Sequence, residues 1–347
     1  MTQFILHVGP HKTGTSYLQE AFAATRPLLA ERGVLYPTTW GMRAHHILCD
    51  ELQTVPNPRL ERQFAELRDS GQPVVLISVE GLTTLPEETV AYLRTLIGDR
   101  CSVRVVFHAR SWGDILPSHW KQAVRGGETQ TLLEYLYARG INPAGSFFVN
   151  FGIGLRRYAN VFGGGSISVV SYDSVLAARL DLFEHFAATF LDWPDPPPLD
   201  LGPVNVSAST VDTEVIRVLN TMERVRRGRP PERLDAVAMA DAYLRRAPDY
   251  AGSALTRAFA AHTAHATVNE TGIILSALHR QLFSEFGHAL VPPNPKTVFF
   301  PPRRADIPYV HHDYLLMPGV VDVLRDIHRQ VRGDLEQPAA VMDRSAA

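Results

Sequence analysis

The sequence predicts an α/β fold, in which a central parallel β-sheet is flanked by helices and the C-terminal half is largely helical. In the first half, short apolar runs alternate with segments of helical periodicity, which is typical of a parallel sheet with crossover helices. The run PVVLISV at residues 73–79 is apolar and rich in β-branched residues, as expected of a strand covered on both faces. Over roughly residues 210–287 the periodicity is helical, and no strand is expected there.

The expected elements alternate in order along the first half. A strand at residues 4–8 ends in Gly9, and a helix at residues 15–31 follows, with Leu18, Phe22 and Leu29 on one face. Residues 36–59 are irregular and rich in Pro, Gly and His, which is typical of an active-site loop. Further strands are expected at residues 73–79, 103–108 and 167–171, and further helices at residues 60–69, 86–97, 112–124 and 173–191.

The second half lacks the alternation of strand-like and helix-like segments seen in the first. We expect helices over roughly residues 210–287, then proline-rich coil, and a last helix near residues 320–331. Residues 1–191 should therefore form an α/β core that carries the binding loops. Residues 192–347 should form a mainly helical extension with a proline-rich tail, packed on the core as one domain.

Composition excludes several classes of partner. Lys and Arg number 34 against 36 Asp and Glu, so the net charge is −2 and no global field draws the chain to nucleic acid or to an anionic membrane. The two cysteines are too few for a disulfide scaffold. No signal peptide or membrane-spanning run is found, so we expect a soluble, cytoplasmic protein. Nothing in the sequence indicates the oligomeric state.

The segment GPHKTGTS, residues 9–16, lies between the first strand and the first helix. A helix start exposes unpaired N–H groups and the positive end of the helix dipole, and glycines let the backbone wrap closely around an anion. The spacing matches a Walker A loop except that Thr15 stands where that motif has its lysine, while Lys12 lies three residues earlier. We therefore expect a phosphate-type ligand here.

This segment resembles the 5′-phosphosulfate-binding loop of sulfotransferases, especially the P-K-T-G-T-[ST] version of bacterial and carbohydrate-modifying members. His11 stands where proline is usual. The resemblance implies a P-loop-like fold and 3′-phosphoadenosine 5′-phosphosulfate (PAPS) as sulfuryl donor, with no metal. The donor would be bound by His11, Lys12, Thr13, Gly14, Thr15 and Ser16.

A second signature supports the resemblance. Members of that family bind the donor's 3′-phosphate with an Arg at the end of a later strand and a Ser eight residues on. Here Arg110 follows the strand at residues 103–108, and Ser118 stands eight residues later in the next helix. A guanidinium suits a phosphate because it offers a planar fork of donors. The two motifs tie the resemblance to residues 1 to about 125.

The reaction needs positive charge on the transferring group and a base for the acceptor's proton. The resemblance and the charge together give Lys12 the first role. Glu80 is our choice of base, because it ends a buried strand and its carboxylate should emerge at the carboxyl edge of the sheet. His45 and His46, in the irregular loop, are competing bases and are assigned to acceptor binding.

The predicted function is sulfuryl transfer from PAPS to a hydroxyl or amine of a carbohydrate or small-metabolite acceptor. One alternative is a P-loop kinase or nucleotide hydrolase, against which the missing lysine before Thr15 counts. Another is a nucleotide-binding or scaffold protein without catalysis; the intact motif residues argue against it.

Three other clusters carry weaker expectations. Arg224, Arg226, Arg227, Arg229 and Arg233 are expected to form a solvated helix end and turn, with contact to an acidic acceptor as the alternative. His311, His312 and Asp313 are expected to be structural, because three adjacent residues should not converge on one ion. Lys296, Arg303 and Arg304 are candidates to cover the donor's 3′-phosphate, as a basic C-terminal loop does in the family.

Overall fold

The computed structural model describes residues 2–202, 208–250, 252–292 and 298–336. The chain divides into two compact units, and each is described by itself. The first comprises Met1–Ile115, Asn142–Asn205 and Asn269–Arg303; the second comprises Leu116–Ile141, Val206–Val268 and Arg304–Ala347. None of the described helices combines the length and apolar character needed to cross a membrane.

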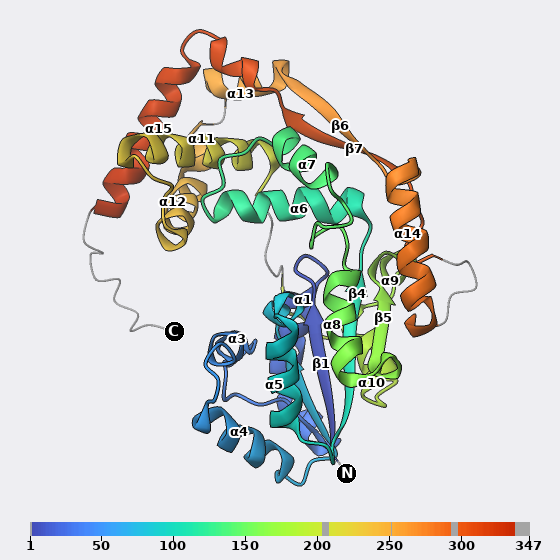
Figure 1. Ribbon diagram of the computed structural model, residues 1–347. Helices are drawn as coiled ribbons and strands as arrows, with labels where there is room; N and C mark the ends of the chain where they lie inside the picture. The colour runs from blue at the N-terminus through green and yellow to red at the C-terminus, as the bar shows by residue number, and fades with distance from the viewer. Residues whose placement is uncertain (1, 203–207, 251, 293–297, 337–347) are drawn as a thin grey trace. The chain divides into compact units, whose positions relative to one another are not determined.

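The first unit is built on a five-stranded sheet in the order β2-β3-β1-β4-β5, and every pair of neighbours is parallel (Figure 1). The α/β fold with a central parallel sheet is therefore confirmed. The strands are β1 Gln3–Gly9, β2 Val34–Leu35, β3 Val74–Ser78, β4 Ser102–Ala109 and β5 Ile167–Ser171.

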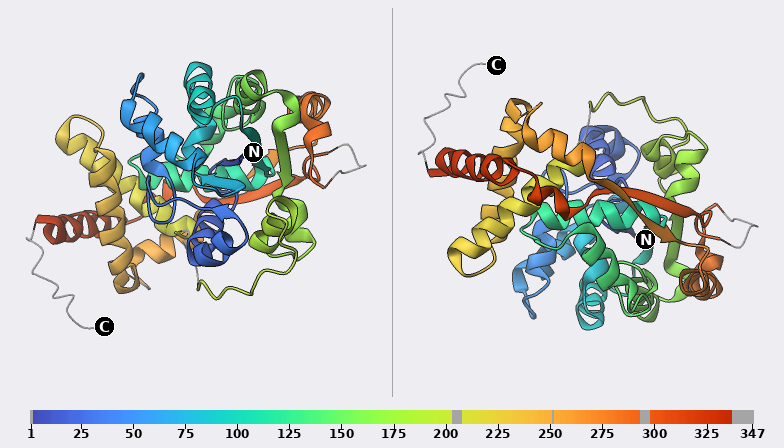
Figure 2. Two further views of the ribbon diagram at one scale, coloured as in Figure 1. Left: turned by 90° about the horizontal axis from the view of Figure 1, so that it is seen from below. Right: turned by 90° about the horizontal axis from the view of Figure 1, so that it is seen from above.

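Helices cover both faces of this sheet, as the end-on views in Figure 2 show. On one face, Phe22 of α1 and Phe186 of α10 pack over Ile5, Val106 and Val170. On the other face, Phe4 of β1 stacks on Phe64 of α4 with ring centroids 6.1 Å apart. The helices of this unit are α1 Thr15–Ala24, α2 Arg26–Glu31, α3 His46–Glu51, α4 Pro58–Arg68, α5 Glu87–Ile97, α8 Gly152–Phe162, α9 Tyr172–Ala177, α10 Leu182–Phe190 and α14 Ile273–Phe286, with short 3-10 turns η1 Glu80–Thr84, η2 Gly164–Ser166 and η4 Gly287–Ala289.

Two helices expected to be continuous are broken. The expected helix at residues 15–31 divides at Thr25, and a proline in the first turn starts α2 there. The expected helix at residues 173–191 divides because Arg179 takes a left-handed conformation at φ 57° and Asp181 caps a new helix. Helix α8 was not expected at all.

The second unit is largely helical, as the sequence predicts. Its helices are α7 Leu132–Gly140, α11 Thr210–Arg227, α12 Arg233–Arg246, α13 Ala254–Ala261 and α15 Val320–Glu336, with residues 116–125 of α6 Trp112–Arg125 and the turns η3 Ala247–Tyr250 and η5 His312–Leu316. The expectation of no strand over residues 210–287 was wrong, because β6 Thr263–Asn269 lies there. It forms a two-stranded sheet with β7 Arg304–Val310, which lies in the stretch expected to be coil. Only alternate residues of these strands are buried, and few of them are bulky, so their apolar pattern is weak.

Candidate functional site

The predicted donor loop and Arg110 lie where the topology favours ligand binding. From β1 the chain runs toward β2 on one side of the sheet, and from β4 it runs toward β5 on the other. The carboxyl ends of two neighbouring strands that diverge in this way form the crevice in which open α/β sheets bind ligands. Residues 9–16 follow β1 and Arg110 follows β4, so both stand at this point.

The backbone of residues 9–16 is wound into an unusual conformation. Gly9, Lys12 and Gly14 all have positive φ, at 97°, 69° and 77°. A Cβ on Gly14 would lie 2.4 Å from Cδ2 of Leu182, so any other residue would have to displace that side chain as well as adopt a left-handed φ. The left-handed conformation is strained at Lys12, because Lys12 has a side chain. Backbone strain of this kind is concentrated at functional sites.

Helix α1 begins directly after this loop with its first turn uncapped. Gly14 is its N-cap and makes no side-chain capping bond, and the first turn holds no acidic residue. Thr13 does not face outward, because its hydroxyl is buried and donates to the carbonyl of Pro10 at 2.7 Å. The helix start therefore offers N–H donors and a positive dipole end to an anion such as a phosphate or sulfate.

The start of α6, after β4, is closed by carboxylates instead. Asp173 accepts a bond from the backbone N–H of Ser111 at 2.8 Å, and Glu270 accepts one from Gly113 at 2.8 Å. The second oxygen of Glu270 accepts from the backbone N–H of Arg303 at 2.9 Å. Burial raises the pKa of both carboxyls. Of these two helix starts, only that of α1 is open to an added anion.

Glu80 is the first residue of η1, two residues after the buried end of β3 at Ser78, and is only 5% exposed. Its Oε1 accepts a hydrogen bond from the hydroxyl of Thr15 at 2.7 Å, and its Oε2 accepts one from Nε2 of Gln19 at 3.2 Å. Burial by itself would raise the pKa of Glu80, but the bonds from Thr15 and from backbone, with His11 nearby, outweigh it, so the pKa lies below its usual value. Glu80 is therefore an ionised carboxylate at neutral pH.

The turn η1 that carries Glu80 is fixed by its neighbours. The phenol of Tyr158 donates to the carbonyl of Leu82 at 2.9 Å, and the hydroxyl of Thr83 donates to the carbonyl of Val8. Cys49 of α3 packs so closely that a Cβ on Gly81 would lie 2.7 Å from its sulfur. Glu80 is thus held in place from α8, β1 and α3.

Arg110 is tied to the donor loop. Its guanidinium donates to the carbonyl of Lys12 and lies over the ring of Tyr172, 5.0 Å from the centroid. Among the described residues its buried Nε has no hydrogen-bond partner. Ser118 is half-buried on the part of α6 that belongs to the second unit, so its pairing with Arg110 stays a prediction.

Sequence reasoning missed two residues at this site. Gln19 lies one helical turn after Thr15, so the spacing of α1 could have placed it beside Glu80. Tyr172 follows the last residue of β5, and strand-end reasoning of the kind that selected Glu80 and Arg110 could have found it.

His45 and His46 are placed differently from each other. His45 is buried, accepts from the backbone N–H of Ser78 through Nδ1 at 3.0 Å, and donates to the carbonyl of Pro37 through Nε2 at 2.8 Å. Burial lowers its pKa to about 4. Because backbone groups engage both ring nitrogens, His45 has a structural role here and no free nitrogen for base work. His46 is exposed at the start of α3, and its assignment to acceptor binding stays a prediction.

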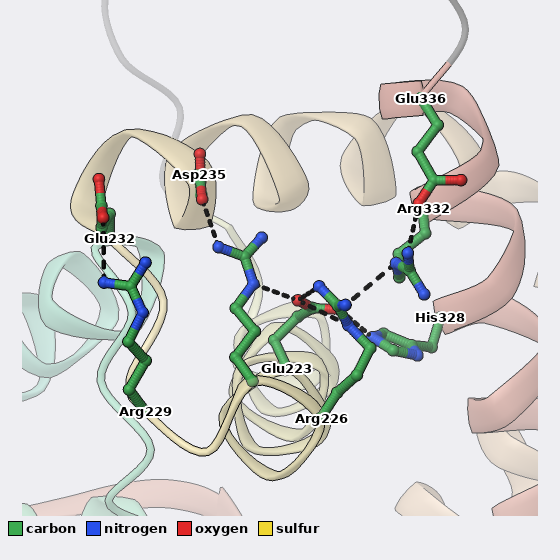
Figure 3. Close-up of polar contacts among 9 residues, drawn as sticks. Glu223, Arg226, Arg229, Glu232, Asp235, His328, Arg332 and Glu336 are labelled. Atoms are coloured by element: carbon green, nitrogen blue, oxygen red, sulfur yellow. Dashed lines mark hydrogen bonds and ion pairs between the residues drawn. The ribbon is translucent and has the colours of Figure 1, made fainter.

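The basic run at the end of α11 is exposed, as expected of a solvated helix end and turn, and three of its arginines also pair with carboxylates. Figure 3 shows Arg226 and Arg332 directed at the carboxylate of Glu223, together with Nε2 of His328 at 2.8 Å. Arg227 bridges Glu223 and Asp235, and Arg229 pairs with Glu232 at 3.1 Å. Burial would raise the pKa of Glu223, but its bonds from Arg226, Arg227 and His328 lower it to about 2. The run is an ion network within the second unit.

The remaining clusters are placed as follows. Arg303 pairs with Asp114 at 2.5 Å in the first unit, and Arg304 lies 4.0 Å from Asp306 in the second. Lys296 lies outside the described residues. His311, His312 and Asp313 are not expected to converge on one ion, yet one ligand atom from each lies within 4.8 Å of the others.

Comparison with known proteins gives a structural likeness and no match in sequence. No family model matches this chain, and no curated protein matches it. Among solved structures, that of a sulfotransferase from Alicyclobacillus acidocaldarius is similar to it, with a TM-score of 0.36 and 15% sequence identity. The likeness covers 65% of this chain and 96% of the sulfotransferase chain.

Proposed function

We propose that this protein transfers a sulfuryl group from PAPS to a hydroxyl or amine of a polar acceptor, a carbohydrate or a small metabolite. The observation that carries the proposal is the open start of α1 beside an ionised carboxylate at one crevice of the sheet. The loop motif adds the resemblance to sulfotransferases. An anion cradle next to a proton acceptor is what group transfer from an anionic donor requires.

Residues 9–16 would bind the donor's 5′-phosphosulfate through backbone N–H groups at the start of α1. The ammonium of Lys12 would stabilise the charge that grows on the bridging oxygen as the sulfur–oxygen bond to the phosphate breaks. The acceptor oxygen or nitrogen forms the new bond to sulfur, in line with the one that breaks. The acceptor's proton goes to Glu80, and 3′-phosphoadenosine 5′-phosphate leaves.

The hydrogen bonds to Glu80 affect how readily it takes the acceptor's proton. Thr15 and Gln19 each occupy one oxygen of the carboxylate, and each oxygen has a further lone pair that can accept a proton. A pKa below the usual value makes Glu80 a weak base. Proton transfer would therefore follow, rather than precede, most of the bond formation to sulfur.

Arg110 would bind the 3′-phosphate of the donor. Its bond to the carbonyl of Lys12 links the two ends of the binding site, and its unpartnered Nε is a donor available for one more acceptor. Ser118 would add a hydroxyl donor. The exposed His46 would contact the acceptor.

A kinase or nucleotide hydrolase is the second candidate. The observation that favours it is Glu80, an acidic residue just after a buried strand, as in the Walker B element that holds Mg²⁺ in P-loop enzymes. Against it, Thr15 occupies the position where those enzymes have the lysine that neutralises the β- and γ-phosphates.

Thermal unfolding with 3′-phosphoadenosine 5′-phosphate, and separately with ATP and Mg²⁺, tests both candidates. A ligand at a hundred times its dissociation constant stabilises the native state by about 2.7 kcal/mol, which raises the melting temperature by several degrees. We expect this shift with the 3′-phosphorylated nucleotide only. Arg110→Ala should reduce it, whereas Arg100→Ala, an exposed arginine before the opposite end of β4, should not.

A shift caused by ATP and Mg²⁺ would separate the two candidates just as clearly. A shift with ATP and Mg²⁺ alone would overturn the sulfotransferase proposal in favour of the kinase. Sulfuryl transfer itself is then measured with labelled PAPS against a panel of carbohydrate and small hydroxyl or amine acceptors.

A further inference from the structure

The turn that joins β7 to η5 in the second unit brings together three metal-ligating side chains. Nδ1 of His311 lies 3.3 Å from Oδ2 of Asp313, and Nε2 of His312 lies 3.6 Å from Oδ1 of Asp313. The two imidazole rings stack with centroids 4.4 Å apart. Ligand atoms roughly 2.0–2.2 Å from a tetrahedral ion lie about 3.3–3.5 Å from one another. The two spacings to Asp313 are close to this range, and all three ligand atoms lie within 4.8 Å of one another.

The electrostatics of the turn favour a cation. Nδ1 of His311 accepts a long bond from the backbone N–H of Asp313, at 3.4 Å, so in the neutral ring its lone pair also faces the carboxylate. Two groups of lone pairs that face each other are stabilised by a proton or a metal ion between them.

The backbone of the turn is anchored on both sides. The backbone N–H of His311 donates to the carbonyl of His262 at 2.9 Å, next to the start of β6. On the other side Tyr314 is fully buried, and its phenol donates to Oε1 of Glu214 at 3.1 Å. An anchored turn loses little conformational entropy when it binds an ion.

The three side chains remain reachable from solvent, with exposed fractions of 38% for His311, 66% for His312 and 52% for Asp313. Two imidazole nitrogens and one carboxylate oxygen suit Zn²⁺ or Cu²⁺, whereas Mg²⁺ and Ca²⁺ prefer sites built of oxygen alone. We propose that His311, His312 and Asp313 bind one Zn²⁺ or Cu²⁺ ion, with water in the remaining position. This site is separate from the proposed sulfuryl transfer and does not depend on it.

Metal titration of the full chain tests the proposal. We expect isothermal titration calorimetry above pH 7 to show one Zn²⁺ site, and paramagnetic resonance with Cu²⁺ to show coupling to two imidazole nitrogens. His312→Ala should weaken the affinity by at least about tenfold, because it removes a ligand. His265→Ala, which changes an exposed histidine of β6 outside the cluster, should leave it unchanged.

Asp313→Asn keeps the size of the side chain and removes its charge, so it tests the carboxylate without depending on His312. Melting temperatures of the variants show that each is folded. Undiminished affinity in both His312→Ala and Asp313→Asn would overturn the proposal, as would the absence of any binding of Zn²⁺ or Cu²⁺ to the folded wild-type chain. Mg²⁺ binding that His312→Ala removes would contradict the assignment to a borderline metal.

Discussion

The hydroxyl of Thr15 donates a 2.7 Å hydrogen bond to Oε1 of Glu80, and this bond joins the first turn of α1 to the end of β3. The anion cradle and the carboxylate are therefore parts of one structure. A ligand that draws the hydroxyl of Thr15 to itself would release one oxygen of Glu80. Occupation of the cradle would in that way make the carboxylate a better proton acceptor, because the bond from Thr15 is a cause of its lowered pKa.

Glu80→Gln is expected to lower the rate of sulfuryl transfer by about 10²–10⁴-fold, the range typical of a lost general base. The amide keeps an oxygen for the bond from Thr15, so the fold and the binding of 3′-phosphoadenosine 5′-phosphate should be retained. Glu80→Asp keeps the charge but shortens the reach, and should be intermediate. The measurement is turnover with labelled PAPS alongside the nucleotide-induced shift in melting temperature. A variant Glu80→Gln with wild-type turnover would show that Glu80 only holds Thr15 and Gln19.

Gly14→Ala is expected to destabilise the protein by about 2–4 kcal/mol, because it adds steric overlap with Leu182 to the strain of a left-handed residue. It should also abolish nucleotide binding, since the first turn of α1 would have to move. Gly71→Ala is the matched control, because Gly71 has nearly the same φ, 76°, with nothing within 4 Å of its added Cβ. Chemical denaturation should show a loss of only about 1 kcal/mol for the control. Equal losses in the two variants would mean that Leu182 moves aside freely.

Strand-end reasoning could predict much of this site. The loop at residues 9–16, Glu80 and Arg110 each follow an apolar run, and the carboxyl ends of parallel strands meet at one edge. The role of His45 could not be predicted, because nothing local shows that its ring reaches the backbone of Ser78, 33 residues away. The cap that Glu270 provides for α6 is still more remote, at a separation of 157 residues. Such long-range polar contacts leave no periodic signal in the sequence.

Acid should destabilise the protein through its buried histidines. Burial lowers the pKa of His7 and of His45 to about 4, against an unfolded value of about 6.5. Between these two values the unfolded chain binds more protons at these histidines, so their contribution to the free energy of unfolding falls as pH drops from about 6.5 to 4 and is constant above that window. Each histidine contributes a slope of up to about 1.4 kcal/mol per pH unit. Because the pKa values of Glu80 and Glu223 are lowered, protonation of these two carboxylates destabilises the folded protein only at lower pH.

Urea denaturation at several pH values measures this slope. His45→Gln should reduce the slope of the free energy of unfolding against pH by the contribution of one histidine, up to about 1.4 kcal/mol per pH unit. His46→Gln, at the exposed neighbouring position, should leave the slope unchanged. A slope that is the same in His45→Gln as in the wild type would contradict the burial of a neutral ring at this position.

Glu223→Gln is expected to be among the more damaging single changes in the second unit. The carboxylate is buried and accepts bonds from Arg226, Arg227 and His328, so its loss leaves three donors facing one neutral amide (Figure 3). Breaking a buried ion pair costs about 3–5 kcal/mol, and partial exposure of the arginines should bring this nearer to 2. Glu232→Gln breaks an exposed pair with Arg229, and should cost less than about 1 kcal/mol. Denaturation midpoints of the two variants separate the cases, because similar losses would mean that solvent screens the Glu223 network as it does the exposed pair.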